Sequence, residues 1–123
     1  VRGSASTTGF GGHVMIMACC TMMPAGLGRF ANVELSNMGQ KKELGRYPLH
    51  WHMVRDVRSG QYVRNSSVHG SNNRAITVHG SHNVLVERNV CFDTEGHAVF
   101  LEDGVEHGNV FTGNLVLATR KPA

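Results

Sequence analysis

The sequence repeats itself weakly at intervals of 23 to 27 residues, and this period restricts the fold more than any other feature. A period in the twenties is typical of solenoids, in which each repeat forms one coil that stacks on the next. The matched segments hold short stretches of alternating apolar and polar residues, which favours strands over helices. Three pairs of segments align: 73–79 with 96–102, 84–92 with 109–117, and 48–52 with 75–79.

The connections between these stretches indicate parallel strands. They are rich in Gly, Asn and Ser, and they contain no Asn-Gly dipeptide of the kind that closes tight antiparallel hairpins. We therefore predict an all-β chain that forms a parallel β-helix of about four coils, with a β-sandwich as the alternative. It comprises a single partial domain, residues 1–123, with clear coils over about 9–118. Residues 54–61 are predicted to form a loop, and Asn89 and Asn114 an inward hydrogen-bonded ladder.

Alternation along the strands separates an inward from an outward face. The predicted inward residues are Leu49, Trp51, Ile76, Val78, Val99 and Leu101. The predicted outward residues include His50, and the alignment stacks three others, His52, His79 and Glu102, in a column on adjacent strands. Asp103 follows at the end of its strand. Histidines beside carboxylates can supply a general acid and a general base. His52, His79 and Glu102 could alternatively hold a divalent metal, and no other cofactor is predicted.

Charge and hydropathy limit the partners. The net charge is +3, but the basic residues are scattered and form no stripe that would neutralise a nucleic-acid backbone. A modest positive charge is compatible with an acidic polysaccharide. No segment approaches the roughly 18 apolar residues of a membrane span. We therefore expect no nucleic-acid partner and no membrane span in this segment.

The three cysteines do not form a disulfide framework. Cys19, Cys20 and Cys91 are predicted to be small buried residues. A single bridge from Cys19 or Cys20 to Cys91 is the alternative.

Several segments also resemble a known family. They are 44–52, which contains Gly-Arg-Tyr-Pro-Leu-His-Trp-His, and 62–69, 74–80 and 96–104. Together they resemble the β-helix region of the cell-migration-inducing hyaluronidase family, which includes the transmembrane hyaluronidase and, more distantly, fibrocystin-like proteins. The resemblance covers about residues 9–118. It implies a right-handed parallel β-helix in an extracellular or cell-surface protein, and we expect this chain to be a fragment of a longer β-helix whose remaining coils are its partner.

The resemblance and the column of side chains together lead to a functional hypothesis. We expect a carbohydrate-active segment that binds or depolymerises an acidic, hyaluronan-type polysaccharide, as a hydrolase or a lyase if it is an enzyme. The alternative is a non-enzymatic structural or adhesion module of the fibrocystin-like type. The candidate catalytic residues are His52, His79, Glu102 and Asp103. The candidate substrate-binding residues are Arg46, His50, Arg74 and His97.

Overall fold

The computed structural model describes residues 1–4, 6–18 and 26–122, except for the side chains of residues 57–59. Regular secondary structure in this part of the chain is entirely β-strand, as predicted. Within it there is no helix long and apolar enough to cross a membrane. The strands are β1 (Val14–Met17), β2 (Arg29–Ala31), β3 (Glu34–Ser36), β4 (Leu49–Arg64), β5 (Ser67–Ser71), β6 (Ile76–Glu87), β7 (Val90–Thr94), β8 (Val99–Leu101), β9 (Val110–Thr112) and β10 (Leu115–Leu117).

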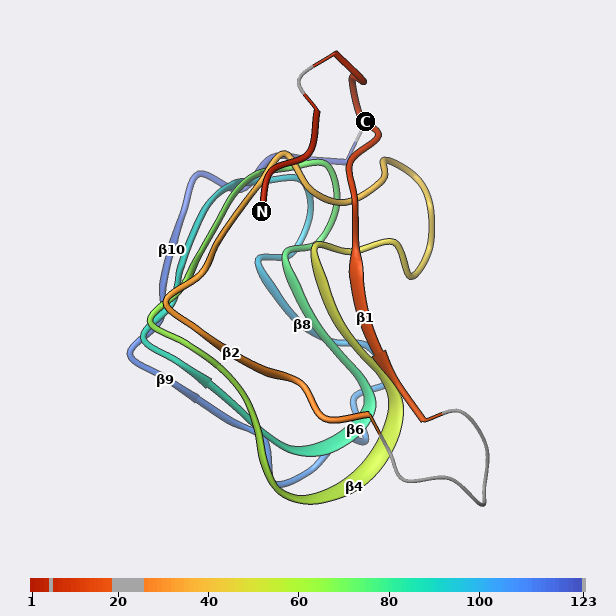
Figure 1. Cartoon of the computed structure of the whole chain (residues 1–123), viewed down its shortest axis with the longest axis vertical. Coiled ribbons are helices and arrows are strands. Elements are labelled where there is room, and N and C mark those ends of the chain that lie inside the picture. The colour runs from red at the N-terminus through yellow and green to blue at the C-terminus, as the bar shows by residue number, and fades with distance from the viewer. Residues whose placement is uncertain (5, 19–25, 123) are drawn as a thin grey trace.

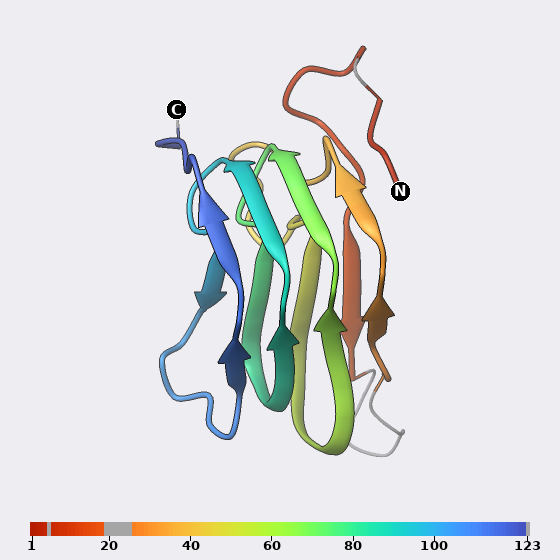
Figure 2. The same cartoon turned by 90° about the vertical axis from the view of Figure 1, so that its left-hand side faces the viewer.

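The strands form two parallel sheets. In one sheet the order is β1-β4-β6-β8, with β2 paired to the second half of β4 and β9 to the second half of β6. In the other sheet the order is β10-β7-β5-β3. β4 and β6 both bend in the middle, so the chain passes along three sides before it returns to the first (Figure 1). Seen from the side, successive passes lie next to one another in chain order (Figure 2), an arrangement consistent with the predicted parallel β-helix.

The alignments made from the sequence predict the strand register correctly. His52 pairs with His79, Ile76 pairs with Val99 and Leu85 pairs with Val110. The predicted loop at residues 54–61 is wrong, because β4 continues through this segment. Two register shifts, after His52 and after Asp56, absorb the bend while strand pairing continues on both sides of it.

Left-handed backbone conformations produce the bends. In β4, Met53 and Arg55 have φ of 52° and 64°. In β6, Gly80 has φ of 51°, and a Cβ atom there would lie 2.5 Å from the sulfur of Met53. Glycine at position 80 therefore allows the two bends to stack closely.

The corner between the second and third sides holds the predicted asparagine ladder. The Asn89 side chain accepts a hydrogen bond from the Ser66 N–H at 3.1 Å and donates to the Val63 carbonyl at 3.0 Å. One coil further on, Asn114 donates to the Val86 carbonyl at 2.8 Å. Asn89 also donates to Asn114 Oδ1 at 3.0 Å. These side chains satisfy backbone groups that the turning chain leaves without strand partners.

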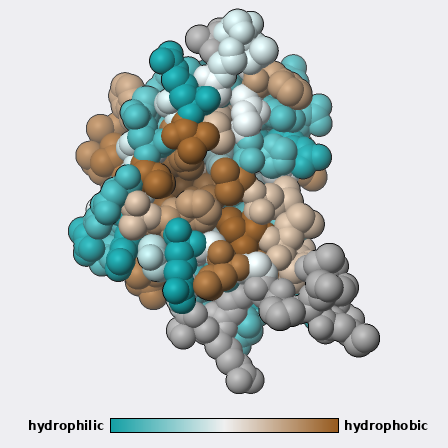
Figure 3. All heavy atoms as spheres, viewed as in Figure 1, coloured by the Kyte–Doolittle hydropathy of each residue, from teal (hydrophilic) through white to brown (hydrophobic). Residues whose placement is uncertain are grey.

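The apolar core lies inside the coils. Leu49, Trp51, Ile76 and Val78 are fully buried, as predicted. Leu101 is 38% exposed, contrary to prediction, because its strand β8 is at the end of the strand order and has a neighbour on one side only. The face viewed in Figure 3 likewise shows hydrophobic side chains in the region that the strands enclose, with polar ones around it.

Cys91 is buried, as predicted for a small core residue. Burial raises the pKa of its thiol to about 12. Cys19 and Cys20 lie outside the described residues, so the alternative of a bridge stays a prediction.

Candidate functional site

The candidate site lies on the outer face of the first side, where β4 and β6 run parallel. His50 and His52 alternate with inward residues along β4, and His52 pairs with His79 on β6. Glu102 and Asp103 follow directly after β8, the next strand in the sheet. The predicted column of His52, His79 and Glu102 is therefore formed by side chains from three adjacent strands or strand ends.

A loop covers part of this face. Residues 39–48, here called the covering loop, are held down by Asn73, whose side-chain amide donates to the carbonyls of Gln40 at 2.8 Å and Glu43 at 2.9 Å. Tyr47 at the end of the loop is fully buried, and its ring lies 4.8 Å from that of His50. His50 is consequently only 1% exposed, which corrects the prediction of an outward-facing, accessible residue.

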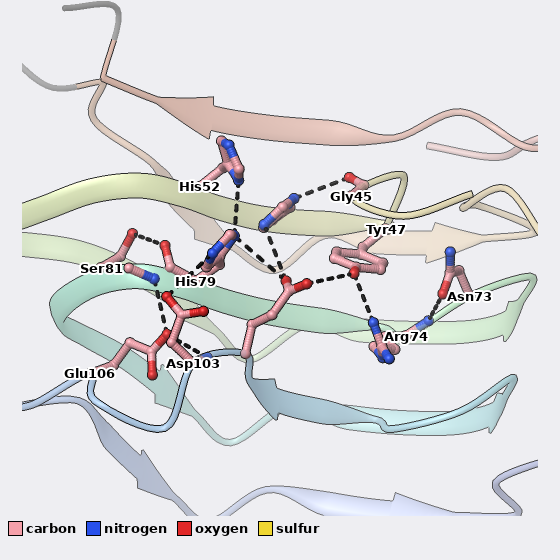
Figure 4. Close-up of polar contacts among 12 residues, drawn as sticks. Gly45, Tyr47, His52, Asn73, Arg74, His79, Ser81, Asp103 and Glu106 are labelled. Carbon is pink, nitrogen blue, oxygen red and sulfur yellow. Dashed lines mark hydrogen bonds and ion pairs between the residues drawn. The ribbon is translucent and has the colours of Figure 1, made fainter. Parts of the chain in front are cut away.

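A chain of hydrogen bonds runs from Arg74 into the site (Figure 4). The guanidinium of Arg74 donates to the Tyr47 hydroxyl at 2.8 Å, and this hydroxyl donates to Glu102 Oε1 at 3.2 Å. Glu102 Oε2 lies 3.9 Å from His50 Nε2. The other ring nitrogen of His50, Nδ1, donates to the Gly45 carbonyl at 3.0 Å. The covering loop therefore positions both a histidine and a carboxylate.

His79 lies between two carboxylates. Its Nδ1 atom is 3.7 Å from Glu102 Oε2, and its Nε2 atom is 3.3 Å from Asp103 Oδ2. The Nδ1 atoms of His52 and His79 are 3.1 Å apart. His50, His52 and His79 each offer one nitrogen within 4.8 Å of the others. The site can thus transfer protons between imidazole and carboxylate, and its nitrogens are spaced closely enough to share a metal ion.

Two positioning residues were not singled out from the sequence. Tyr47 lies within the motif Gly-Arg-Tyr-Pro-Leu-His, and this motif is the sequence signal that could have identified it. Glu106 accepts hydrogen bonds from the N–H groups of Gly80 at 2.9 Å and Asp103 at 3.1 Å. Burial raises the pKa of Glu106, but the backbone N–H groups of four residues together outweigh burial and lower it overall; they are those of Gly80, Glu106, Asp103 and Gly104. Glu106 thereby fixes the turn that presents Asp103, and no local pattern in the sequence points to it.

Burial controls the protonation of the two histidines on β4. It lowers the pKa of His50 to about 4, against a raising effect of the Gly45 carbonyl and with a further lowering by neighbouring histidines. Burial and the adjacent His79 also lower the pKa of His52, although Glu102 and Asp103 oppose this. His50 is therefore neutral at pH 7, with a lone pair on Nε2 that faces Glu102.

His50, His52, His79 and Glu102 line a cleft of about 270 Å³. Arg46 also lines the cleft, is exposed and contacts His13 Nε2 through its guanidinium at 3.1 Å. Arg46 therefore supplies positive charge beside the cluster.

The other two predicted substrate residues lie elsewhere. Arg74 and His97 line a neighbouring cleft of about 220 Å³, and Tyr47 also lines it. The Arg74 guanidinium is 4.3 Å from the centre of the Phe100 ring, on which His97 also stacks at 4.8 Å. The structure thus separates Arg74 and His97 from the histidine cluster, although Tyr47 connects Arg74 to it.

Comparison with known proteins shows which family the chain belongs to. The sequence profile of one family, described as CEMIP beta-helix, matches residues 9–123. The chain belongs to the CEMIP beta-helix family. This confirms the resemblance inferred from the motifs around the covering loop, the histidine strands and Glu102.

The relatives of this CEMIP beta-helix chain include a fibrocystin, a hyaluronidase and a G8 domain-containing protein. Fibrocystin-L of Mus musculus is 45% identical over 108 residues, which cover 88% of this chain and 2% of that protein. The cell surface hyaluronidase of Danio rerio is 43% identical over 117 residues, covering 90% of this chain and 8% of the relative. A G8 domain-containing protein of Dictyostelium discoideum is 44% identical over 114 residues, covering 93% and 9%. The chain thus spans less than a tenth of each of these relatives.

Proposed function

We propose that this chain is a carbohydrate-active β-helix segment that binds or depolymerises an acidic polysaccharide of the hyaluronan type. The observation that carries the proposal is the cleft that His50, His52, His79 and Glu102 line, in a chain whose relatives include a cell surface hyaluronidase. The proposal includes about four right-handed coils, an extracellular or cell-surface location, and further coils of a parent β-helix.

Positive charge next to the cleft suits a glycan that carries carboxylates. Arg46 lines the histidine cleft, and Lys42 and Arg74 line its neighbour. The neighbouring cleft also contains the carboxylates of Glu43 and Glu95, so a polyanion would meet unbalanced positive charge at Arg46 rather than there. The planar guanidinium groups are suited to bidentate contact with a carboxylate.

The cluster supports two depolymerising reactions. In hydrolysis, Glu102 or Asp103 is the general acid that protonates the leaving oxygen, and the other carboxylate or a histidine is the base or charge stabiliser. His79 can pass protons between the two carboxylates because each lies near a different ring nitrogen. In elimination, His52 removes the proton next to the uronate carboxylate and Arg46 offsets the charge that develops there. The C–O bond to the leaving sugar then breaks, and Glu102 or Asp103 protonates the leaving oxygen.

The test is binding and size-resolved digestion of hyaluronan, other glycosaminoglycans and a neutral glucan. We expect His52→Ala and Glu102→Gln to weaken binding or slow digestion of the acidic glycan at least tenfold. His69→Ala is the matched control, because His69 lies on β5 in the other sheet, with its Nε2 atom 2.7 Å from Glu34 Oε1. Equal glycan binding and digestion by all three variants and the wild type would contradict the proposal. Absence of binding to every glycan would favour the non-enzymatic structural module.

A further inference from the structure

Two buried acceptor atoms face each other in the cluster. Because a carbonyl oxygen can only accept, the contact of His50 Nδ1 with the Gly45 carbonyl at 3.0 Å places the ring proton on Nδ1 and a lone pair on Nε2. His50 Nε2 and Glu102 Oε2 are 3.9 Å apart. Neither has a hydrogen-bond partner among the residues that the structure describes. Two buried lone pairs in this arrangement are costly unless a cation or a donor lies between them.

A third lone pair points to the same place. The Nε2 atom of His79 lies 3.3 Å from the Asp103 carboxylate, which can only accept, so the ring proton belongs on Nε2 and the lone pair on Nδ1. His79 Nδ1 is 3.7 Å from Glu102 Oε2 and 3.1 Å from His52 Nδ1. Ligand atoms around a tetrahedral ion at about 2.1 Å are about 3.4 Å apart. The observed separations of 3.1, 3.7 and 3.9 Å bracket that value.

The outer contacts are those that metal-binding histidines and carboxylates have. The Gly45 carbonyl orients His50, the Asp103 carboxylate orients His79, and the Tyr47 hydroxyl holds Glu102 Oε1 at 3.2 Å. Pairing of β4 with β6 fixes the backbones of the histidines. The site is therefore rigid before an ion arrives, and the cleft above it provides an entry path and room for one further ligand.

We propose that His50, His52, His79 and Glu102 bind one divalent transition-metal ion of the zinc class. Three imidazoles and one carboxylate suit Zn²⁺ or its neighbours in the first transition row rather than Mg²⁺ or Ca²⁺, which prefer oxygen ligands. The ion would bridge the acceptor atoms that otherwise face one another. The proposal stands on this geometry and holds whether or not the cleft binds a glycan. With the ion bound, His52 and Glu102 are its ligands and do not act as the base and the acid of the reactions described above.

The experiment is a calorimetric titration of the tag-free, chelator-treated chain with ZnCl₂, and a spectroscopic titration with CoCl₂, both without glycan. We expect one ion per chain and the intense visible absorption of four- or five-coordinate Co²⁺. His79→Ala and Glu102→Gln should each lower the affinity for Zn²⁺ at least tenfold. Tyr47→Phe removes an outer contact and should lower it about tenfold.

The matched control is His82→Ala. His82 stacks on His107 at 3.9 Å between ring centres, so these two histidines could compete with the site for Zn²⁺. If the ion binds at the proposed site, His82→Ala should leave the affinity for Zn²⁺ unchanged. Circular dichroism checks that each variant folds, and if His79→Ala does not, Glu102→Gln and Tyr47→Phe decide.

The proposal is overturned if the wild-type chain gives no Co²⁺ absorption or no Zn²⁺ heat. It is also overturned if the wild type and the site variants have equal affinity for Zn²⁺. Metal binding without glycan binding would support the metal site and count against the proposed function. Glycan binding without metal binding would support the proposed function and overturn the metal site.

Discussion

Replacing Asn89 with alanine tests the idea that side-chain amides hold the corners of the coils together. The Asn89 amide satisfies the Ser66 N–H at 3.1 Å, the Val63 carbonyl at 3.0 Å and Asn114 Oδ1 at 3.0 Å. Asn89 is only 1% exposed, so water does not readily replace these bonds. Each lost bond costs about 1 kcal/mol, and leaving a buried N–H unpaired adds about 1 to 3 kcal/mol. We expect the free energy of unfolding to fall by about 4 to 6 kcal/mol.

Urea unfolding followed by tryptophan fluorescence measures this change. The chain has one tryptophan, Trp51, which is fully buried and therefore reports on the interior of the coils. The matched control is Asn72→Ala, because the Asn72 amide makes only long contacts, at 3.4 Å to the Gly39 carbonyl and 3.5 Å to that of Asn37. It should lose less than about 1 kcal/mol. Equal losses in the two variants at an unchanged m-value would refute the reasoning.

Three further outcomes are expected. Gly11→Ala should lower the melting temperature far more than Gly12→Ala, because an added Cβ at position 11 would overlap the Asn37 carbonyl oxygen, whereas at position 12 the nearest atom is 3.4 Å away. In chelator-treated protein the free energy of unfolding should fall as the pH drops from about 6.5 to about 4, by at most about 3 kcal/mol. The reason is that the pKa of His50 is lowered to about 4 in the folded chain, and an identical pH profile for His50→Asn would contradict this origin. In a variant with the other two cysteines replaced by serine, Cys91 should react with a thiol reagent at pH 8 only after denaturation, because burial raises its pKa to about 12; fast reaction of the folded chain would be the contrary result.

The register of the strands was predictable because a parallel ladder stacks like residues on like residues. Aligning His52 with His79 and Ile76 with Val99 required only the repeat, and the strand pairs confirm both. The asparagine ladder was predictable for the same reason, since Asn89 and Asn114 occupy equivalent corners. In a solenoid, neighbours in space are neighbours at one period along the chain, so local pattern carries tertiary information.

The exposure of the site residues was not predictable in this way. His50 alternates outward along its strand, yet it is buried because Tyr47 and the covering loop fold back over it. The roles of Tyr47 and Glu106 also depend on individual side-chain hydrogen bonds, to Glu102 and from the Gly80 N–H, which the repeat does not specify. The same is true of the segment at 54–61, where polar residues suggested a loop but strand pairing continues on both sides of the bend.

The sequence by itself determined the strand class, the parallel pairing and the column that brings His52, His79 and Glu102 together, because all three follow from periodicity. Only the tertiary structure decided which of these groups water reaches and where their lone pairs point. It placed His50 Nε2 opposite Glu102 Oε2 at 3.9 Å and moved Arg74 and His97 to a separate cleft. The physical reason is that the covering loop is irregular, and its position is fixed by individual hydrogen bonds such as those of Asn73 rather than by a repeating ladder.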